Sequence, residues 1–312
     1  MEIKIIAITG ATSSIGVALT KLAISKNIKV LAFVNPKSIN IERVPNNKLV
    51  KIIPCGLEDY CSFDINNYKV TSETLRADVF FHLAWGHTNR LERNDPELQI
   101  DNIKYSIESV KIAENLGCHT YIGAGSQAEY GPKDFEINES TSATPISAYG
   151  ITKLCSGQLT RLACNNIKIR HIWPRIFSTY GPYTQESTII AYTINCIKNN
   201  ESPKYSPCNQ IWDFLYVKDA ANALFVLAKF GKNNEIYNVA YGQSRPLKEY
   251  LYLIKDSVGK NINFRIGELP YSQVGPLILK ANTEKLTKLG FKAKYSFEKG
   301  IDEYYLWNTT KN

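Results

Sequence analysis

Short apolar runs alternate along this chain with longer stretches whose apolar residues recur at helical spacing. The first run, residues 3–8, is rich in β-branched residues, and after a glycine turn Ile15, Leu19 and Leu22 mark one buried helical stripe. Further strand-like runs cover residues 29–34, 49–53, 79–83, 120–123 and 167–172, and the clearest helical stretch covers residues 97–116. This alternation predicts an α/β fold with a doubly wound parallel sheet and helices on both faces.

The turn after the first strand, residues 9–16, has the sequence TGATSSIG. Unpaired amides and the helix dipole at its end favour an anion, and Gly10 and Gly16 permit a pyrophosphate and the helix to approach closely. Ser13 stands where the dinucleotide-binding fingerprint has its middle glycine. Taken alone, the segment leaves a dinucleotide site and a plain strand–helix turn equally open.

Side chains with useful chemistry follow two later strands and one later helix start. Ser126 lies in the segment GAGSQAEYG at the end of the fifth strand, the edge at which parallel sheets bind ligands. Tyr149 and Lys153 are one helical turn apart, so a phenol and an ammonium share one helix face. Because an ammonium beside a phenol stabilises the phenolate, the pair is suited to moving a proton at neutral pH.

Together these motifs resemble the extended short-chain dehydrogenase/reductase family, the NAD-dependent epimerases and dehydratases of nucleotide sugars. The resemblance spans nearly the whole chain and includes HLA at 82–84, Asn102, RIFSTYGP at 175–182 and DFLYVKDA at 213–220. It implies a Rossmann-type fold with a smaller C-terminal substrate-binding lobe, and a homodimer. We expect residues 1–175 plus 210–240 to form the dinucleotide-binding domain and residues 176–209 plus 241–312 the substrate-binding lobe.

The resemblance also implies roles for individual residues. Tyr149 is expected to be the general acid/base, Lys153 to tune it and hold the nicotinamide ribose, and Ser126 to bind the reacting oxygen. Hydride transfer at a sugar carbon requires proton transfer at the attached oxygen, which explains why two hydroxyls are needed there. The residues expected to bind the cofactor are Gly10, Thr12, Ser13, Ser14, Ile15, Gly16, Asn35, Lys37, Leu57, Leu83, Ala84, Trp85, Asn102, Tyr149, Lys153 and Ile176.

Departures from the family pattern narrow the reaction. Sugar-nucleotide dehydratases carry an Asp-Glu pair after the hydroxyl residue, whereas Gln127 and Ala128 stand here and neither can protonate a leaving hydroxide. The remaining reactions oxidise or reduce one carbon, once in a ketoreductase or twice in an epimerase.

Other departures concern binding. Trp212 replaces the arginine that usually grips the substrate diphosphate, and Ser178 replaces a common asparagine. The residues expected to bind the substrate are Gln127, Arg175, Trp212 and Arg245.

The end of the second strand bears on the choice of cofactor. It reads FVNPKS at residues 33–38, without the carboxylate that NAD-binding folds commonly place there. Asn35 and Lys37 are suited to a 2′-phosphate, so the sequence favours NADP, with NAD as the alternative.

Composition excludes several other classes. The net charge of +8 is spread along the 312 residues rather than gathered in the basic stripe that nucleic-acid binding requires. The histidines show no metal-ligand spacing, so we expect no metal. Seven cysteines without close spacing indicate reduced thiols in a cytoplasmic protein, and Lys4 interrupts the opening apolar run, which argues against a signal peptide or membrane span.

Three functional hypotheses follow. The first is an NADPH-dependent reductase of a 4-keto-6-deoxy sugar nucleotide that serves polysaccharide biosynthesis. The second is a nucleotide-sugar epimerase that retains NAD, and the third is a non-catalytic dinucleotide sensor. The presence of Ser126, Tyr149 and Lys153 argues against the sensor, because sensors generally lose the acid/base groups.

Overall fold

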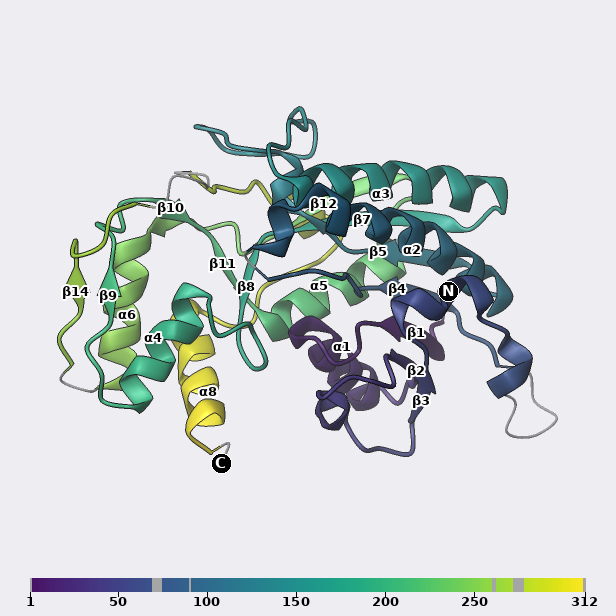
Figure 1. The fold of residues 1–312 in the computed structure, drawn as a ribbon, viewed down its shortest axis with the longest axis horizontal. Coiled ribbons are helices and arrows are strands. Elements are labelled where there is room, and N and C mark those ends of the chain that lie inside the picture. Colours follow the sequence, from purple (N-terminus) through teal and green to yellow (C-terminus); the bar gives the residue numbers. More distant parts are fainter. Residues whose placement is uncertain (1, 69–74, 90, 260–261, 272–277, 311–312) are drawn as a thin grey trace.

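One parallel sheet forms the centre of the protein (Figure 1). The computed structural model describes residues 2–68, 75–89, 91–259, 262–271 and 278–310. Its strand order is β12 (Glu235–Val239), β7 (Arg170–Ile176), β5 (Thr120–Gly123), β4 (Val79–His82), β1 (Ile5–Thr9), β2 (Lys29–Val34) and β3 (Val50–Pro54). Every pairing within it is parallel, and the short β6 (Gly125–Ser126) also pairs with β7. The predicted doubly wound sheet is therefore confirmed.

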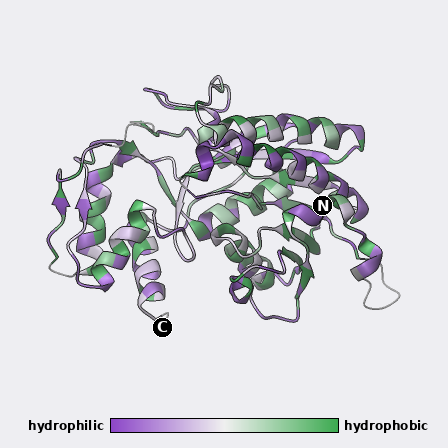
Figure 2. Ribbon diagram, in the orientation of Figure 1, coloured by the Kyte–Doolittle hydropathy of each residue, from purple (hydrophilic) through white to green (hydrophobic). Residues whose placement is uncertain are grey.

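Helices cover both faces of this sheet (Figure 1). They are α2 (Pro96–Asn115) and α3 (Ala148–Asn166) on one face and α1 (Ser14–Ser25) and α5 (Val217–Phe230) on the other. Because successive strand residues point to opposite faces, Ile6 and Ile8 join one buried cluster with Leu19, whereas Ala7 joins another with Ile112. Figure 2 shows the corresponding alternation of hydrophobic and hydrophilic segments along the helices.

A smaller lobe lies beside the sheet, on the left in Figure 1. It contains α4 (Ile189–Lys198), α6 (Leu247–Val258) and α8 (Phe297–Thr310), with three strand pairs: β8 (Ser178–Tyr180) with β11 (Phe214–Tyr216), β9 (Lys204–Tyr205) with β14 (Arg265–Ile266), and β10 (Ile211–Trp212) with β13 (Arg245–Pro246). Its core is aromatic: the ring centroids of Tyr250 and Phe297 are 4.6 Å apart, and those of Phe214 and Tyr250 are 5.0 Å apart.

Short helices complete the described part of the chain. They are α7 (Glu284–Thr287) and the 3-10 helices η1 (Ile41–Arg43), η2 (Leu57–Ser62), η3 (Ile65–Tyr68), η4 (Glu92–Asn94) and η5 (Gln127–Glu129). The predicted strand at 167–172 is misplaced, because α3 continues to Asn166, Lys168 adopts a φ of +58°, and β7 begins only at Arg170. Ile169 donates its amide to the carbonyl of Cys164, so the first apolar residues of that run close the helix. The predicted domain boundaries stay predictions.

Candidate active site

The turn between β1 and α1 forms a cradle that only glycine permits. Gly10 has a φ of +68°, and a Cβ there would stand 2.8 Å from the amide nitrogen of Ala84. A Cβ on Gly16 would stand 2.2 Å from the carbonyl oxygen of Gly10. The first-turn amides of α1 lack intrahelical acceptors, and close backbone approach at such a helix end is the arrangement that a dinucleotide pyrophosphate requires. The residues of the turn therefore fit the cofactor that the sequence predicts.

The serines of this turn have other partners. Ser13 is the N-cap of α1, and its hydroxyl accepts a hydrogen bond from the amide of Gly16 at 3.0 Å. The hydroxyl of Ser14 donates to the carbonyl of Pro182 at 2.6 Å. Their side chains are thus occupied within the protein, and the amide of Ser13 donates to the carbonyl of Gly10 at 3.0 Å. Any contribution of this turn to a phosphate therefore comes from the backbone amides of Thr12, Ser14 and Ile15.

His82 fixes the segment that faces this turn. Its Nδ1 lies 2.9 Å from the hydroxyl of Thr9, and its Nε2 lies 3.4 Å from the hydroxyl of Ser106. Burial, with a smaller effect of the Lys153 charge, lowers the pKa of His82 to about 3, so the ring is neutral. The Thr9 hydroxyl also accepts from the amide of Ala84, which places Leu83 and Ala84 beside the glycine turn.

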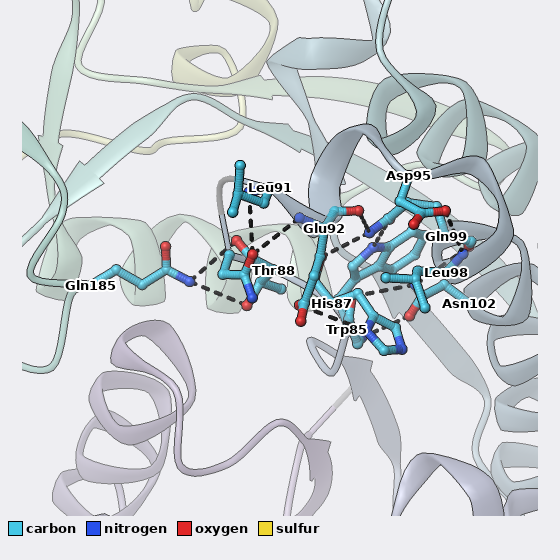
Figure 3. A network of polar contacts seen from close by, with 12 residues as sticks. Trp85, His87, Thr88, Leu91, Glu92, Asp95, Leu98, Gln99, Asn102 and Gln185 are labelled. Atoms are coloured by element: carbon cyan, nitrogen blue, oxygen red, sulfur yellow. Dashed lines mark hydrogen bonds and ion pairs between the residues drawn. The ribbon is translucent and has the colours of Figure 1, made fainter.

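Two amide side chains of α2 hold the loop that follows β4 (Figure 3). Asn102 accepts from the amide of Gly86 at 2.7 Å and donates to its carbonyl at 3.3 Å. Gln99 donates to the carbonyl of His87 at 2.7 Å and accepts from the indole of Trp85 at 3.0 Å. The amide of Asn102 is therefore bonded to the loop, and its predicted contact with the cofactor stays a prediction.

The same loop is also hydrogen-bonded to a segment that follows β8. In Figure 3 the Gln185 side chain approaches Thr88 from the opposite direction, and its amide nitrogen lies 3.1 Å from the Thr88 hydroxyl. Gln185 follows β8, which belongs to the smaller lobe. The loop therefore connects the sheet edge with the lobe.

Lys153 lies at the centre of the candidate site. Only 4% of its surface is exposed, and its Nζ donates to the carbonyl of Ala124 at 2.7 Å. The ammonium is 3.5 Å from the centroid of the Trp85 ring. Burial lowers the pKa of Lys153 to about 7, while the Glu129 carboxylate raises it and the Arg93 guanidinium lowers it. The group therefore exchanges its proton near neutral pH.

Tyr149 and Ser126 lie on adjoining elements. The Tyr149 ring meets Trp85 edge-on with centroids 5.9 Å apart. Ser126 caps η5, accepting from the amide of Ala128 at 3.2 Å, and pairs in register with Ile176 of β7. The first turn of α3 packs against η5, because a Cβ on Gly150 would stand 2.5 Å from the carbonyl of Ala128. The structure thus brings the predicted catalytic residues to one corner of the sheet edge; their catalytic roles stay predictions.

Arg175 forms a buried ion pair with Glu129. Its Nε lies 2.7 Å from the Glu129 carboxylate, and both side chains are buried. Glu129 also accepts from the amide of Ser126 at 2.8 Å and from the indole of Trp173 at 3.0 Å. This buried ion pair argues against a contact between Arg175 and a substrate phosphate, and the predicted role of Arg175 in substrate binding stays a prediction. Arg175 and Glu129 instead support the turn that carries Ser126.

Trp212 and Arg245, both predicted to bind substrate, are cross-strand partners in the β10–β13 pair. The indole of Trp212 donates to the hydroxyl of Ser178 at 2.8 Å. The two departures from the family pattern, Trp212 and Ser178, are thus bonded to each other. Gln127, the fourth predicted substrate residue, is half-buried in η5 beside Ser126.

Sequence reasoning missed Arg93. Its guanidinium lies 3.9 Å from the centroid of the Tyr149 ring, and no carboxylate of the described residues forms an ion pair with it. Arg93 belongs to η4, within a loop that has no periodic pattern, so nothing in the sequence points to it. The structure adds this cation to the candidate site.

The prediction of NADP depended on the absence of a carboxylate at the end of β2, and the structure changes that premise. Asn35 accepts from the amide of Lys37 at 2.8 Å, and its Nδ2 lies 3.4 Å from the carboxylate of Glu58. A carboxylate therefore does stand at the end of β2, supplied by η2 rather than by β2 itself. Leu57 precedes Glu58, and its Cδ1 lies 3.7 Å from where a Cβ on Gly86 would be.

Other expectations concern groups outside the site. All seven cysteines are unpaired. Within the described ranges, no three histidine, cysteine or acidic side chains gather in a way that would hold a metal ion. The helices that the structure describes are each too short or too polar to span a bilayer.

The pKa of Lys153 leads to a prediction about stability. The unfolded chain, in which a lysine titrates near pH ~10.4, holds a proton at Lys153 that the folded chain releases near pH 7. Because the unfolded state binds more protons above pH 7, the contribution of Lys153 to stability rises with pH there, by about 1 kcal/mol per pH unit. In urea unfolding at pH 7, 8 and 9, the free energy of unfolding of wild type should increase relative to that of Lys153→Met. A constant difference between the two proteins would contradict the lowered pKa.

Comparison with known proteins identifies the family and the fold. The model of the NAD dependent epimerase/dehydratase family matches residues 6–240. A CDP-abequose synthase of Salmonella muenchen is 24% identical over 96% of this chain and 96% of its own, and dTDP-glucose 4,6-dehydratase 1 of Escherichia coli is 30% identical over 55% of this chain and 51% of its own. A UDP-N-acetylglucosamine 4-epimerase structure from Methanobrevibacter ruminantium superposes with a TM-score of 0.88 at 25% identity, covering both chains fully. The chain belongs to the NAD-dependent epimerase/dehydratase family.

Proposed function

We propose that this protein reduces the keto group of a 4-keto-6-deoxy sugar nucleotide to an alcohol. The observation that carries the proposal is the turn at 126–129. It offers the hydroxyl of Ser126 but lacks the additional acid and base that a dehydratase has after that residue. Gln127 and Ala128 have no titratable group, and Glu129 is buried against Arg175. The site therefore has groups for one proton transfer at one oxygen, which suits a ketoreductase or an epimerase rather than a dehydratase. The CDP-abequose synthase is similar over nearly its full length, which supports the ketoreductase.

The residues divide the work as follows. A nicotinamide dinucleotide supplies the hydride when it is bound, and leaves oxidised. Ser126 donates a hydrogen bond to the carbonyl oxygen of the sugar, and Tyr149 gives its proton to that oxygen as negative charge develops on it. Lys153 stabilises the phenolate that remains, and solvent restores the proton. The Tyr149 proton on the oxygen would balance the hydride on the carbonyl carbon, so one alcohol would form for each dinucleotide oxidised.

NADP, which the sequence favours as the hydride donor, would depend on Lys37 to bind its 2′-phosphate.

The assay for this function follows the absorbance of reduced dinucleotide. The purified chain is mixed with NADH or NADPH and with 4-keto-6-deoxy sugars activated by CDP, UDP or dTDP. We expect one-way oxidation of one equivalent of dinucleotide for each alcohol formed. Interconversion of two sugar nucleotides without net oxidation would favour the epimerase, the second candidate, which the epimerase structure at 25% identity supports. Binding of dinucleotide without either reaction would favour the sensor.

We also propose that Arg93 binds the substrate. Its guanidinium stands against the ring of Tyr149 without an acidic partner among the described residues, so its donor fork is available beside the side chain predicted to give the proton.

Replacing Arg93 with alanine should raise KM by about 10- to 100-fold with a smaller change in kcat, as expected for a lost charge-assisted hydrogen bond. Steady-state kinetics with the best substrate of the panel measures this. Lys111→Ala, which removes an exposed cation on α2, is the matched control and should leave KM unchanged. An unchanged KM for Arg93→Ala would remove Arg93 from the site.

A homodimer completes the proposal. Apolar side chains of α2 and α3, among them Ile100, Ile151 and Leu162, are more than half exposed in the single chain. A second copy packed on these helices would cover them, and sedimentation velocity of the purified chain decides between monomer and dimer.

A further inference from the structure

The end of β2 lies beside a carboxylate that comes from another part of the chain. Strands β2 and β3 are in register up to Val34 and Pro54, so the residues that follow both strands emerge together. Glu58 lies in the first turn of η2, and its Oε1 is 3.4 Å from the side-chain nitrogen, Nδ2, of Asn35. Gly56 permits this approach, because a Cβ there would stand 2.8 Å from Glu58 Oε2.

This position has a defined use in dinucleotide-binding sheets. A carboxylate at the end of the second strand accepts hydrogen bonds from the hydroxyls of the adenosine ribose, and it repels a phosphate on the 2′-oxygen. We propose that Glu58 supplies this carboxylate in place of a β2 residue and makes the chain select NAD(H) over NADP(H). The inference rests on the dinucleotide site of the proposed function and not on which sugar is reduced.

The local contacts direct Asn35 toward Glu58. The Asn35 side-chain oxygen accepts from the amide of Lys37 at 2.8 Å, so its nitrogen is the group left to face the carboxylate. Glu58 is exposed, and no lysine or arginine of the described residues forms an ion pair with it. Its charge is therefore accessible to a ligand and uncompensated by the protein.

A second carboxylate strengthens the negative potential. Asp59 accepts from the amide of Gly56 at 2.8 Å, which fixes the start of η2. Burial raises the pKa of the nearby Cys55 thiol to about 12, and Asp59 and Glu58 both add to that rise. A phosphate, with a charge of about −1.5 to −2, would enter this field at a cost, whereas ribose hydroxyls would find acceptors.

Lys37 is the cation that opposes this assignment. It is exposed and close to Asn35 in the chain, but a single lysine is a point charge on a flexible stem and lacks the paired donors with which arginine grips a phosphate. A dominant Lys37 would favour NADP(H), whereas a dominant Glu58 would favour NAD(H). Substituting each residue in turn shows which of the two determines the preference.

The experiment measures the dissociation constants of NADH and NADPH by isothermal calorimetry, without any sugar substrate. We expect wild type to bind NADH about tenfold or more tightly than NADPH, and Glu58→Gln to reduce that ratio by about tenfold or more, through weaker NADH and tighter NADPH binding. Glu42→Gln, which removes an exposed carboxylate on η1, is the matched control and should keep the wild-type ratio.

Other outcomes would overturn the inference. Tighter binding of NADPH that is lost in Lys37→Ala and unchanged in Glu58→Gln would assign the selection to Lys37 and NADP. If wild type bound NADH and NADPH equally tightly, and Glu58→Gln did so too, Glu58 would have no effect on cofactor selection. The proposal that the chain binds a dinucleotide would be unaffected by that result. Failure of wild type to bind either dinucleotide would overturn the proposed function as well.

Discussion

Turnover should fall by about 10²- to 10⁴-fold when Tyr149 is replaced by phenylalanine, because the proton donor at the reacting oxygen is lost. The phenylalanine ring keeps the edge-on contact with Trp85 and the face that Arg93 covers, so the shape of the site is preserved. The affinity for the dinucleotide should therefore stay close to that of wild type. Initial rates of dinucleotide oxidation and calorimetric dissociation constants measure the two effects separately.

Tyr252→Phe is the matched control for this substitution. Tyr252 lies on α6, and about half of its surface is exposed, so loss of its hydroxyl should change neither rate nor binding. Turnover of Tyr149→Phe at the wild-type rate would reject Tyr149 as the acid. Loss of dinucleotide binding in the same variant would indicate a structural role instead.

The second large effect is expected at Glu129. Its replacement by alanine leaves the Arg175 guanidinium buried without its carboxylate, and removal of one partner of a buried ion pair typically costs about 3–5 kcal/mol of folding free energy. The amide of Ser126 and the indole of Trp173 lose their acceptor in the same step. Urea unfolding followed by circular dichroism measures the free energy of unfolding.

The control removes a carboxylate from an exposed pair. Glu284 faces Lys288 one helical turn away, with both side chains mostly in solvent, and such pairs contribute little. Glu284→Ala should therefore unfold near the wild-type urea concentration. If Glu129→Ala were equally stable, the buried network would not support the turn that carries Ser126. Glu129→Gln, which keeps the shape and an acceptor, should lie between the two.

Local patterns predicted the sheet and pointed to the candidate catalytic residues. Strand runs such as residues 29–34 and 120–123 were located to the residue, because buried parallel strands are short, apolar and bounded by turns. The Tyr149–Lys153 pair was located because helix geometry fixes which residues share a face. The order of strands at one sheet edge then placed Ser126 near them.

Contacts between distant residues were not predictable in this way. Arg175 and Glu129 are 46 positions apart, and Asn35 and Glu58 are 23 apart. No periodicity links such residues, so the sequence offered Arg175 as a free cation and the end of β2 as free of carboxylates. In both cases the structure adds a carboxylate from another strand end that the sequence did not indicate.

The position of Trp85 makes the intrinsic fluorescence of the protein a reporter of the candidate site. Its indole is held by Gln99 and lies against the ammonium of Lys153, the residue predicted to hold the nicotinamide ribose. Indole emission responds to neighbouring charge, and it overlaps the absorption band of a reduced nicotinamide. Intrinsic fluorescence should therefore dim as the site fills, so occupancy is readable in solution without label or substrate.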